Sequence, residues 1–192
     1  MKPVVFSEIL GLGEYEAIRS AFRARIIDEK RRRRVKLGDR ASCVFENHET
    51  ALWQIQEMLR TERITKRASV EHEMQTYNAL VPGDYELSAT IMFEIDDKTE
   101  RDTFLANALG FERHVHLTVN GERVNATWDP ERAHEDQASA VLYLKFPLGE
   151  ARAAQVRAKT PKIELGVDHP SYAAVTELPT QVVESLAEDL RD

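Results

Sequence analysis

Apolar residues recur at helical spacing in three stretches of the first eighty residues. The first stretch predicts an amphipathic helix over about residues 14–33. The second predicts a helix over 48–64 with Asn47 at its N-cap, and the third a helix capped by Ser69 that runs to about residue 80. The apolar positions of the first helix are Tyr15, Ile18, Phe22 and Ile26. The N-terminal part of the chain is therefore expected to be mainly helical.

Strand patterns dominate the rest of the chain. Residues 85–95 alternate between apolar and polar, which predicts a strand with one buried face. Residues 140–146 are apolar on both faces, as in a strand at the centre of a sheet. Shorter alternating stretches around Gly38 predict a hairpin over 35–45, and a further strand is expected over 162–167.

Local signals predict where several elements begin and end. Asp97 is placed to cap a helix that Gly110 closes. The pair Asn120-Gly121 is a strong signal for a two-residue hairpin turn. Two short helices are also expected, over about residues 150–159 and 180–190.

Together these elements predict an α+β fold, with a mostly antiparallel sheet of about five strands and helices packed on one face. The chain has 192 residues, 42% of them hydrophobic, which is enough for one sizeable core. No repeat or linker divides the sequence, so residues 1–192 are expected to form a single domain. Its helical part would span about residues 1–81 and its sheet-containing part about residues 82–192.

Charge is distributed unevenly along the chain. The net charge is −7, but residues 19–40 carry ten Lys or Arg against three Asp or Glu, a local balance of +7. A basic segment on an acidic body can bind phosphates, although no aromatic residues interleave with it to stack bases, which argues against nucleic acid. The other interpretation is that these cations close a helix and pair with the acidic body or a second subunit. The candidates for contact with a partner are Trp53, Arg31, Arg32, Arg33 and Arg34.

The single cysteine, Cys43, restricts the chemistry open to the chain. It excludes an intrachain disulfide, a four-cysteine iron–sulfur cluster and covalent haem, and it reads as a small buried apolar side chain. Nucleotide-binding motifs are absent, and Glu131–His134 is a lone Glu-X-X-His, whereas a helix-bundle di-iron site uses two. The longest apolar run, 140–144, is too short to cross a membrane, and the N-terminus does not resemble a signal peptide. We therefore expect a cytoplasmic protein.

Glu62 and Glu73 are the most informative carboxylates. Each lies on or beside the apolar stripe of one of two successive predicted helices, and a buried carboxylate needs a partner. If the two meet, they could share a proton or bind a cation, so both are candidates for catalysis and for metal binding. Glu57 and Glu86 are weaker candidates for catalysis. The alternative for the first two is a salt bridge to the basic helix or to a nearby arginine: Arg60, Arg63 or Arg67.

Histidines supply the remaining candidates. His114 and His116 project from one face of a predicted strand about 7 Å apart, so a metal would need a third ligand, from Asn125 or a neighbouring strand. A polar, solvent-facing sheet surface is the alternative interpretation. His169, in an Asp-His-Pro sequence after a strand, is a candidate for catalysis because functional residues often lie there, although the same sequence is ordinary in turns.

Several stretches resemble the bacterial family known as domain of unknown function 3501, and the similarity spans nearly the whole chain. They include the sequences FEN at 45–47, QIQEML at 54–59, ELSAT at 86–90 and VDHPSY at 167–172. The family has no established activity, so the resemblance implies no catalytic residue. Genes of the family often lie beside those of rubrerythrin-like and iron–sulfur oxidoreductases, so the resemblance implies a redox protein partner.

Three hypotheses about function follow. The missing nucleophile, phosphate and cofactor motifs, together with the resemblance, favour an accessory or binding module for a redox partner. Opposite charges on two parts of the chain would also suit a homo-oligomer. The first alternative is a metal-dependent enzyme that uses carboxylates and histidines, which requires at least three of them to converge. The second is nucleic-acid binding through residues 30–36, which would depend steeply on salt. The sequence leaves open which cofactor, if any, is bound.

Overall fold

The computed structural model describes residues 1–130, 137–159 and 162–190, and within them eight strands form two four-stranded antiparallel sheets. The strand orders are β1-β2-β3-β6 and β5-β4-β7-β8. The strands are β1 (Arg34–Leu37), β2 (Ala41–Glu46), β3 (Glu86–Phe93), β4 (Val115–Val119), β5 (Glu122–Asn125), β6 (Val141–Pro147), β7 (Ile163–His169) and β8 (Tyr172–Glu177). The helices are η1 (Phe6–Glu8), α1 (Leu12–Arg31), α2 (His48–Thr61), α3 (Arg67–Asn78), α4 (Lys98–Asn107), η2 (Phe111–His114), α5 (Gly149–Arg157) and α6 (Thr180–Asp189).

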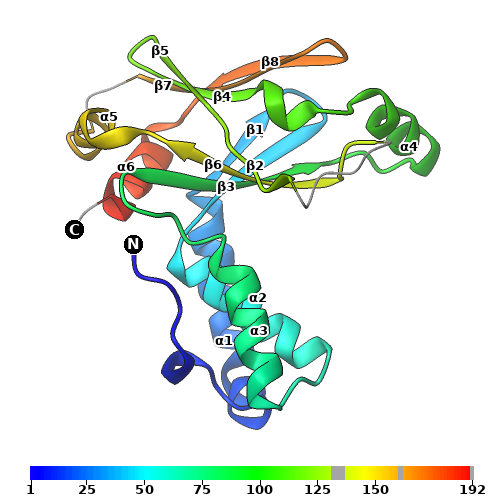
Figure 1. Cartoon of the computed structure of the whole chain (residues 1–192), viewed down its shortest axis with the longest axis vertical. Helices are drawn as coiled ribbons and strands as arrows, with labels where there is room; N and C mark the ends of the chain where they lie inside the picture. Colours follow the sequence, from blue (N-terminus) through cyan, green and yellow to red (C-terminus); the bar gives the residue numbers. More distant parts are fainter. Residues whose placement is uncertain (131–136, 160–161, 191–192) are drawn as a thin grey trace.

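The α+β class and the antiparallel pairing are confirmed, but the core is arranged differently from the prediction. The two sheets lie face to face, and their inward residues form one buried cluster, to which Ile91 and Leu144 contribute from the first sheet and Leu117 and Leu165 from the second. Helix α4 closes one end of this sandwich, and α5 and α6 lie at the other (Figure 1). The predicted count of about five strands in one sheet was therefore too low.

The two sheets also meet at their edges. At one side, Thr127 bridges to Lys145 of β6 through two backbone hydrogen bonds of 2.7 and 2.8 Å. At the other, the Tyr172 hydroxyl of β8 donates to the Leu37 carbonyl (2.6 Å) and accepts from the Arg40 amide (3.2 Å). The β1–β2 turn is thereby fixed against the second sheet.

Helices α1, α2 and α3 form a stalk that projects from the sandwich (Figure 1). Ile55 and Leu59 of α2 pack with Val70 and Met74 of α3 in a core separate from that of the sheets. Their spacing of four residues places each pair on one helix face. The N-terminal segment lies along the stalk, where the Val4 amide donates to the Asn78 side chain (2.8 Å).

Capping explains where the stalk helices end. The Asn47 cap of α2 is confirmed, because its side chain accepts from the Thr50 amide (3.0 Å). Helix α2 stops at Thr61, before the predicted end. Arg63 adopts a positive φ of 53°, and the Ile64 amide bonds back to the Leu59 carbonyl (2.9 Å), the pattern of a Schellman C-cap. Helix α3 begins at Arg67 with Lys66 at its N-cap, so the prediction that Ser69 caps this helix was wrong.

The hairpin and helix-cap predictions in the sheet region are confirmed, except at Gly110. The hairpin at Asn120-Gly121 has positive φ at both residues, as a two-residue turn of this kind requires. Asp97 caps α4 by accepting from the Glu100 amide (2.8 Å). Gly110 does not close that helix as predicted: α4 ends at Asn107 with Ala108 as its C-cap, and Gly110, with a φ of 78°, is the N-cap of η2. Short polar signals with a defined hydrogen bond were therefore sufficient to place the hairpin and the Asp97 cap.

Three strands differ from the prediction, two in their burial and one because it was not predicted. The strand predicted at the centre of a sheet, β6, is an edge strand, and its outward residues Val141 and Tyr143 are exposed. Strand β3 is buried on both faces, and Thr90 of its outer face donates to Glu46 of β2 (2.6 Å). Strand β8 was not predicted, because only small or polar residues follow Tyr172 at its inward positions.

No helix in the described part of the chain is long and apolar enough to cross a membrane. Cys43 is fully buried, as predicted, and burial raises the pKa of its thiol. The division into a helical part and a sheet-containing part stays a prediction, although β1 and β2 of the first sheet come from within residues 1–81. Glu131 and His134, the lone Glu-X-X-His, lie outside the described residues.

Candidate functional site

A groove of about 570 Å³ opens where the second half of α1 faces β1 and the side of α2. We call it the basic groove, and its lining residues are Arg23, Ile26, Ile27, Lys30, Arg31, Arg34, Lys36 and Trp53. Five of these side chains are cationic, three are apolar or aromatic, and none is a carboxylate. Several like charges in one concave surface attract ligands of the opposite sign.

The five cations of the basic groove differ in their partners. Arg31 pairs with Asp28 (2.7 Å) and Arg34 with Glu94 (3.3 Å), both at exposed sites where an ion pair stabilises little. The side chains that form no hydrogen bond or ion pair with any described residue are Arg23, Lys30 and Lys36. The groove therefore presents at least three positive charges that the described chain does not neutralise.

Trp53 gives the basic groove its aromatic wall. The side chain is half-buried and packs edge-on against Phe22, with ring centroids 5.4 Å apart, and against Tyr15 at 6.2 Å. Ile27 beside it is 42% exposed. A rigid aromatic side chain next to an exposed aliphatic one offers apolar contact at little entropic cost.

Arg32 and Arg33, the other two arginines of the run, point away from the basic groove. Arg33 is 2% exposed, and its guanidinium donates to both oxygens of Asp189 in α6 (2.5 and 2.8 Å) and to Glu29 (2.5 Å). Burial raises the pKa of Asp189, and the contact with Arg33 opposes that increase. Arg32 pairs with Glu29 (2.6 Å) and Glu188 (3.6 Å). These two arginines connect α1 to α6 through ion pairs. This agrees with the interpretation that part of the basic segment pairs with acidic residues of the same chain.

Glu57, a catalytic candidate, joins α1 to α2. Its carboxylate accepts both fork hydrogen bonds of Arg19 (2.8 Å each) and one from the Tyr15 hydroxyl (2.6 Å). The hydrogen bond from Arg19 holds the pKa of Glu57 below its usual value, and burial only partly opposes this shift. These three hydrogen bonds give Glu57 a structural role between the two helices.

Because the pKa of Glu57 is lowered, its ionised form stabilises the fold above the ordinary glutamate pKa of about 4.3, and this stabilisation is lost as the pH falls through the folded value. We therefore expect Glu57→Gln to lower the melting temperature at neutral pH and to lower it less at acidic pH, below the ordinary glutamate pKa of about 4.3. Thermal unfolding monitored by circular dichroism at both pH values measures the difference. Glu16→Gln, which removes an exposed pair with Arg60, is the control and should matter little at either pH. Equal losses at both pH values for Glu57→Gln would contradict the assignment.

Glu62 and Glu73 are placed differently from the prediction. Glu62 is the C-cap residue of α2 and is exposed, because the helix ends before it, and Glu73 is half-buried on α3. Neither carboxylate has a hydrogen bond or ion pair with a described residue. Two of the arginines expected beside them pair with other residues, Arg60 with Glu16 and Arg67 with Glu71. Burial therefore gives no reason for either carboxylate to need a ligand.

Glu86 stabilises the turn before β3. Its carboxylate accepts from Lys145 of β6 (2.6 Å) and from the Gly83 amide (2.9 Å). Both contacts come from the chain itself, so Glu86 is a local structural carboxylate in this arrangement.

The histidines gather at one end of the second sheet. His114 Nδ1 lies 3.2 Å from Asp168, whose carboxylate also accepts from Arg123 (2.7 Å). The hydrogen bond from Arg123 is the main reason that the pKa of Asp168 falls to about 2. The His114 ring also meets the His169 ring edge-on, with centroids 4.9 Å apart. The fold therefore brings residues 114–116 and 168–169 together, a contact that the sequence analysis did not predict.

Both ring nitrogens of His169 and Nδ1 of His116 face the backbone. In His169, Nδ1 accepts from the Ser171 amide (3.1 Å), so Nε2 carries the proton and donates to the Leu109 carbonyl (3.2 Å). His116 is buried, with Nδ1 3.2 Å from the His114 carbonyl and its ring flat over Gly166. Within residues 1–130, 137–159 and 162–190, no three His, Cys, Asp or Glu side chains come close enough to hold a metal ion. The convergence that the metal-enzyme hypothesis requires is not found there.

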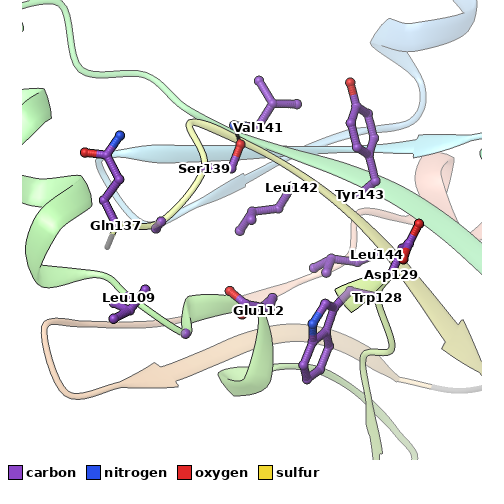
Figure 2. Close-up of a pocket in the computed structure, with 12 residues that line it drawn as sticks. Leu109, Glu112, Trp128, Asp129, Gln137, Ser139, Val141, Leu142, Tyr143 and Leu144 are labelled. Carbon is purple, nitrogen blue, oxygen red and sulfur yellow. Dashed lines mark hydrogen bonds between the residues drawn. The ribbon is translucent and has the colours of Figure 1, made fainter. Parts of the chain in front are cut away.

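A second concavity, of about 290 Å³, lies at the β6 edge of the sandwich. We call it the edge cavity, and Figure 2 shows its lining: Leu109, Gly110, Glu112, Trp128, Asp129, Gln137, Ala138, Ser139, Val141, Leu142, Tyr143 and Leu144. Glu112 follows Gly110 in the short helix η2 and looks like an ordinary surface charge in the sequence. The sequence did not single out Glu112 or Trp128, nor did it separate Arg23, Lys30 and Lys36 from the other cations.

The fold and these two concavities define an α+β protein with a two-sheet sandwich and a helical stalk. A crystal structure of a novel protein of unknown function from Burkholderia pseudomallei K96243 is similar, with a TM-score of 0.92 and 34% sequence identity over 99% of this chain and 100% of that one. None of the curated proteins matches the sequence. The chain belongs to the family described as Protein of unknown function (DUF3501), whose model matches residues 3–190.

Proposed function

We propose that this protein is a non-catalytic binding module that docks an acidic segment of a partner protein in the basic groove. The single observation that supports this function is the groove lining, in which five cations surround Ile27 and Trp53 without a carboxylate. Interfaces are commonly built from an aromatic anchor with charges around it, and the charges speed association and select the partner. The rest of the protein is acidic, so the groove is the region where a negatively charged surface is attracted.

A protein segment fits the basic groove better than a nucleic acid does. Binding single strands requires successive aromatic faces for stacking, and among the described residues that line the groove Trp53 is the only aromatic one. A net charge of −7 also repels an extended polyanion, whereas a short acidic segment contacts only the groove. A second copy of the chain could supply acidic residues as well, and the experiment below separates that case.

The family resemblance supports a redox protein as the partner, through the neighbouring genes of rubrerythrin-like and iron–sulfur proteins. The basic groove would then be an accessory surface that holds such a protein by its acidic side chains. The metal-enzyme alternative stays a prediction and has no group of three ligands in the described chain to support it.

The test uses a fluorescein-labelled peptide of alternating Glu and Leu and measures its binding by fluorescence anisotropy at increasing salt. We expect binding that weakens as salt rises, and a loss of about 100-fold in the variant with Arg23→Glu, Lys30→Glu and Lys36→Glu, because three reversed charges repel the peptide. The matched control reverses three exposed cations outside the groove, Lys2, Lys66 and Arg113, which changes the net charge equally. This control should bind almost as the wild type does.

Three outcomes would contradict the proposal. Equal losses in the two triple variants would show that only net charge matters. Tighter binding of a labelled DNA oligonucleotide than of the peptide would favour the nucleic-acid alternative. A dimer in analytical ultracentrifugation that becomes a monomer only in the groove variant would show that a second copy of the chain occupies the groove. If the peptide binds as expected, the same variants can be tested against a purified rubrerythrin-like protein.

A further inference from the structure

The edge cavity contains a carboxylate that the described chain does not satisfy. Glu112 is 8% exposed, yet its side chain forms no hydrogen bond or ion pair with any described residue. Its carboxylate oxygens are not among the buried polar atoms that lack a hydrogen-bond partner, so water reaches them and a polar ligand group could take the place of that water. Figure 2 shows the Glu112 side chain between Leu109 and Trp128, beneath Leu142, directed into the cavity.

The surroundings of Glu112 are apolar on most sides. Leu142 and Leu144 point into the edge cavity from β6, and Trp128 lies opposite them (Figure 2). No lysine, arginine or histidine is present among the described residues that line the cavity. Among these residues Glu112 therefore favours a cation over an anion.

From this geometry we propose that the edge cavity binds a small organic cation, a protonated amine carried on an apolar body. The ammonium group pairs with the Glu112 carboxylate in a charge-assisted hydrogen bond. Trp128 lines the same cavity and can contact the cation through its ring, and the leucines contact the apolar body. A volume of about 290 Å³ is at the lower end of small-molecule sites, which limits the ligand to a small amine.

This site is independent of the basic groove. The groove and the edge cavity share no lining residue and attract ligands of opposite charge. The amine site would therefore let the binding module bind a small molecule as well as a protein partner. A negative result for one site would leave the proposal for the other site unchanged.

The probe is phenethylamine, and phenethyl alcohol and 3-phenylpropionate are its neutral and anionic controls of similar shape. Isothermal titration calorimetry on the full chain at neutral pH should show that the amine binds about tenfold more tightly than the alcohol, or better, and that the acid does not bind. Glu112→Gln should lower the affinity for the amine about tenfold or more and leave that for the alcohol unchanged. Trp128→Phe should weaken amine binding by a smaller factor, because phenylalanine is a poorer cation–π partner. Glu150→Gln, an exposed carboxylate on α5, is the matched control and should bind as the wild type does.

A second readout concerns the protein without ligand. Because Glu112 has no partner in the described chain and water reaches its oxygens, Glu112→Gln should leave the melting temperature of the free protein nearly unchanged. A lower melting temperature would show that the carboxylate is needed for folding and would overturn the assignment. The proposal is also overturned if the amine does not bind, if amine and alcohol bind equally, or if Glu112→Gln leaves amine binding unchanged.

Discussion

Replacing Arg33 with methionine is expected to lower the free energy of unfolding by about 3–5 kcal/mol, the cost of removing one partner from a buried ion pair. Arg33 is 2% exposed and is the cation shared by Asp189 and Glu29. Methionine has a similar length and fills much of the space, so the loss comes mainly from Asp189, which is left buried without a counter-charge, whereas Glu29 keeps its pair with Arg32. Equilibrium denaturation in urea, followed by circular dichroism, measures the change through the transition midpoint.

Two further variants show whether charge is the cause of the Arg33 effect. Arg31→Met removes an exposed arginine from the same run and should change stability by no more than about 0.5 kcal/mol. Adding Asp189→Leu to Arg33→Met removes one unpaired carboxylate and should recover part of the loss, because an apolar pair often replaces a buried ion pair without cost. The explanation fails if Arg33→Met costs less than about 1 kcal/mol or if the second substitution adds its own full penalty.

Gly38→Ala should be the second most disruptive substitution, with an expected loss of about 2–4 kcal/mol. Gly38 has a φ of 69°, where alanine is strained, and an added Cβ would lie 2.1 Å from the Tyr172 hydroxyl. Tyr172 has little freedom to move, because its hydroxyl bonds to Leu37 and Arg40 and its ring packs on Phe104. The substitution would therefore separate β1 from β8. The change is measured by thermal and urea unfolding.

A double-mutant cycle isolates the contact between Gly38 and Tyr172. Tyr172→Phe alone should cost about 1–2 kcal/mol, through its lost hydrogen bonds. In the double variant the hydroxyl clash is gone, so the combined loss should be smaller than the sum of the two single losses, and the remainder should reflect backbone strain at positive φ and the ring carbon 2.9 Å from the new Cβ. If the two losses of unfolding free energy are additive, there is no steric contact between residue 38 and the Tyr172 hydroxyl.

The parts of the fold that the sequence predicts well are those set by local chemistry. Asn47 and Asp97 cap helices because a short side-chain acceptor reaches an amide three residues later. Asn120-Gly121 forms its hairpin because both residues tolerate positive φ. The position of β6 in its sheet depends instead on which strands pair with each other. A sequence that is apolar on both faces is compatible with a strand at the centre of a sheet and also with an edge strand that lines a cavity, so the sequence could not distinguish the two.

The candidate sites were harder to predict because exposure and pairing decide them. The four consecutive arginines 31–34 are equivalent in composition, yet one is buried against α6 and two line the basic groove. Glu62 appeared to lie on an apolar stripe only because the helix was extended past its true end at Thr61. Glu112 carries no signal at all, since a charged residue after Gly110 is ordinary at the surface. Its importance comes from Trp128 and β6, which the fold brings to it.

The contact between Arg33 and Asp189 joins residues 156 positions apart in the chain. It connects the base of the helical stalk to α6, which follows all the strands of the sandwich in the sequence. Closing so long a loop is entropically costly, so the contact is stable only when the intervening sheets are already paired. Conversely, the stalk is not free to detach while the sandwich stays folded, because that would leave the buried Asp189 carboxylate without its counter-charge. We therefore expect stalk and sandwich to unfold as one cooperative unit, despite their separate hydrophobic cores.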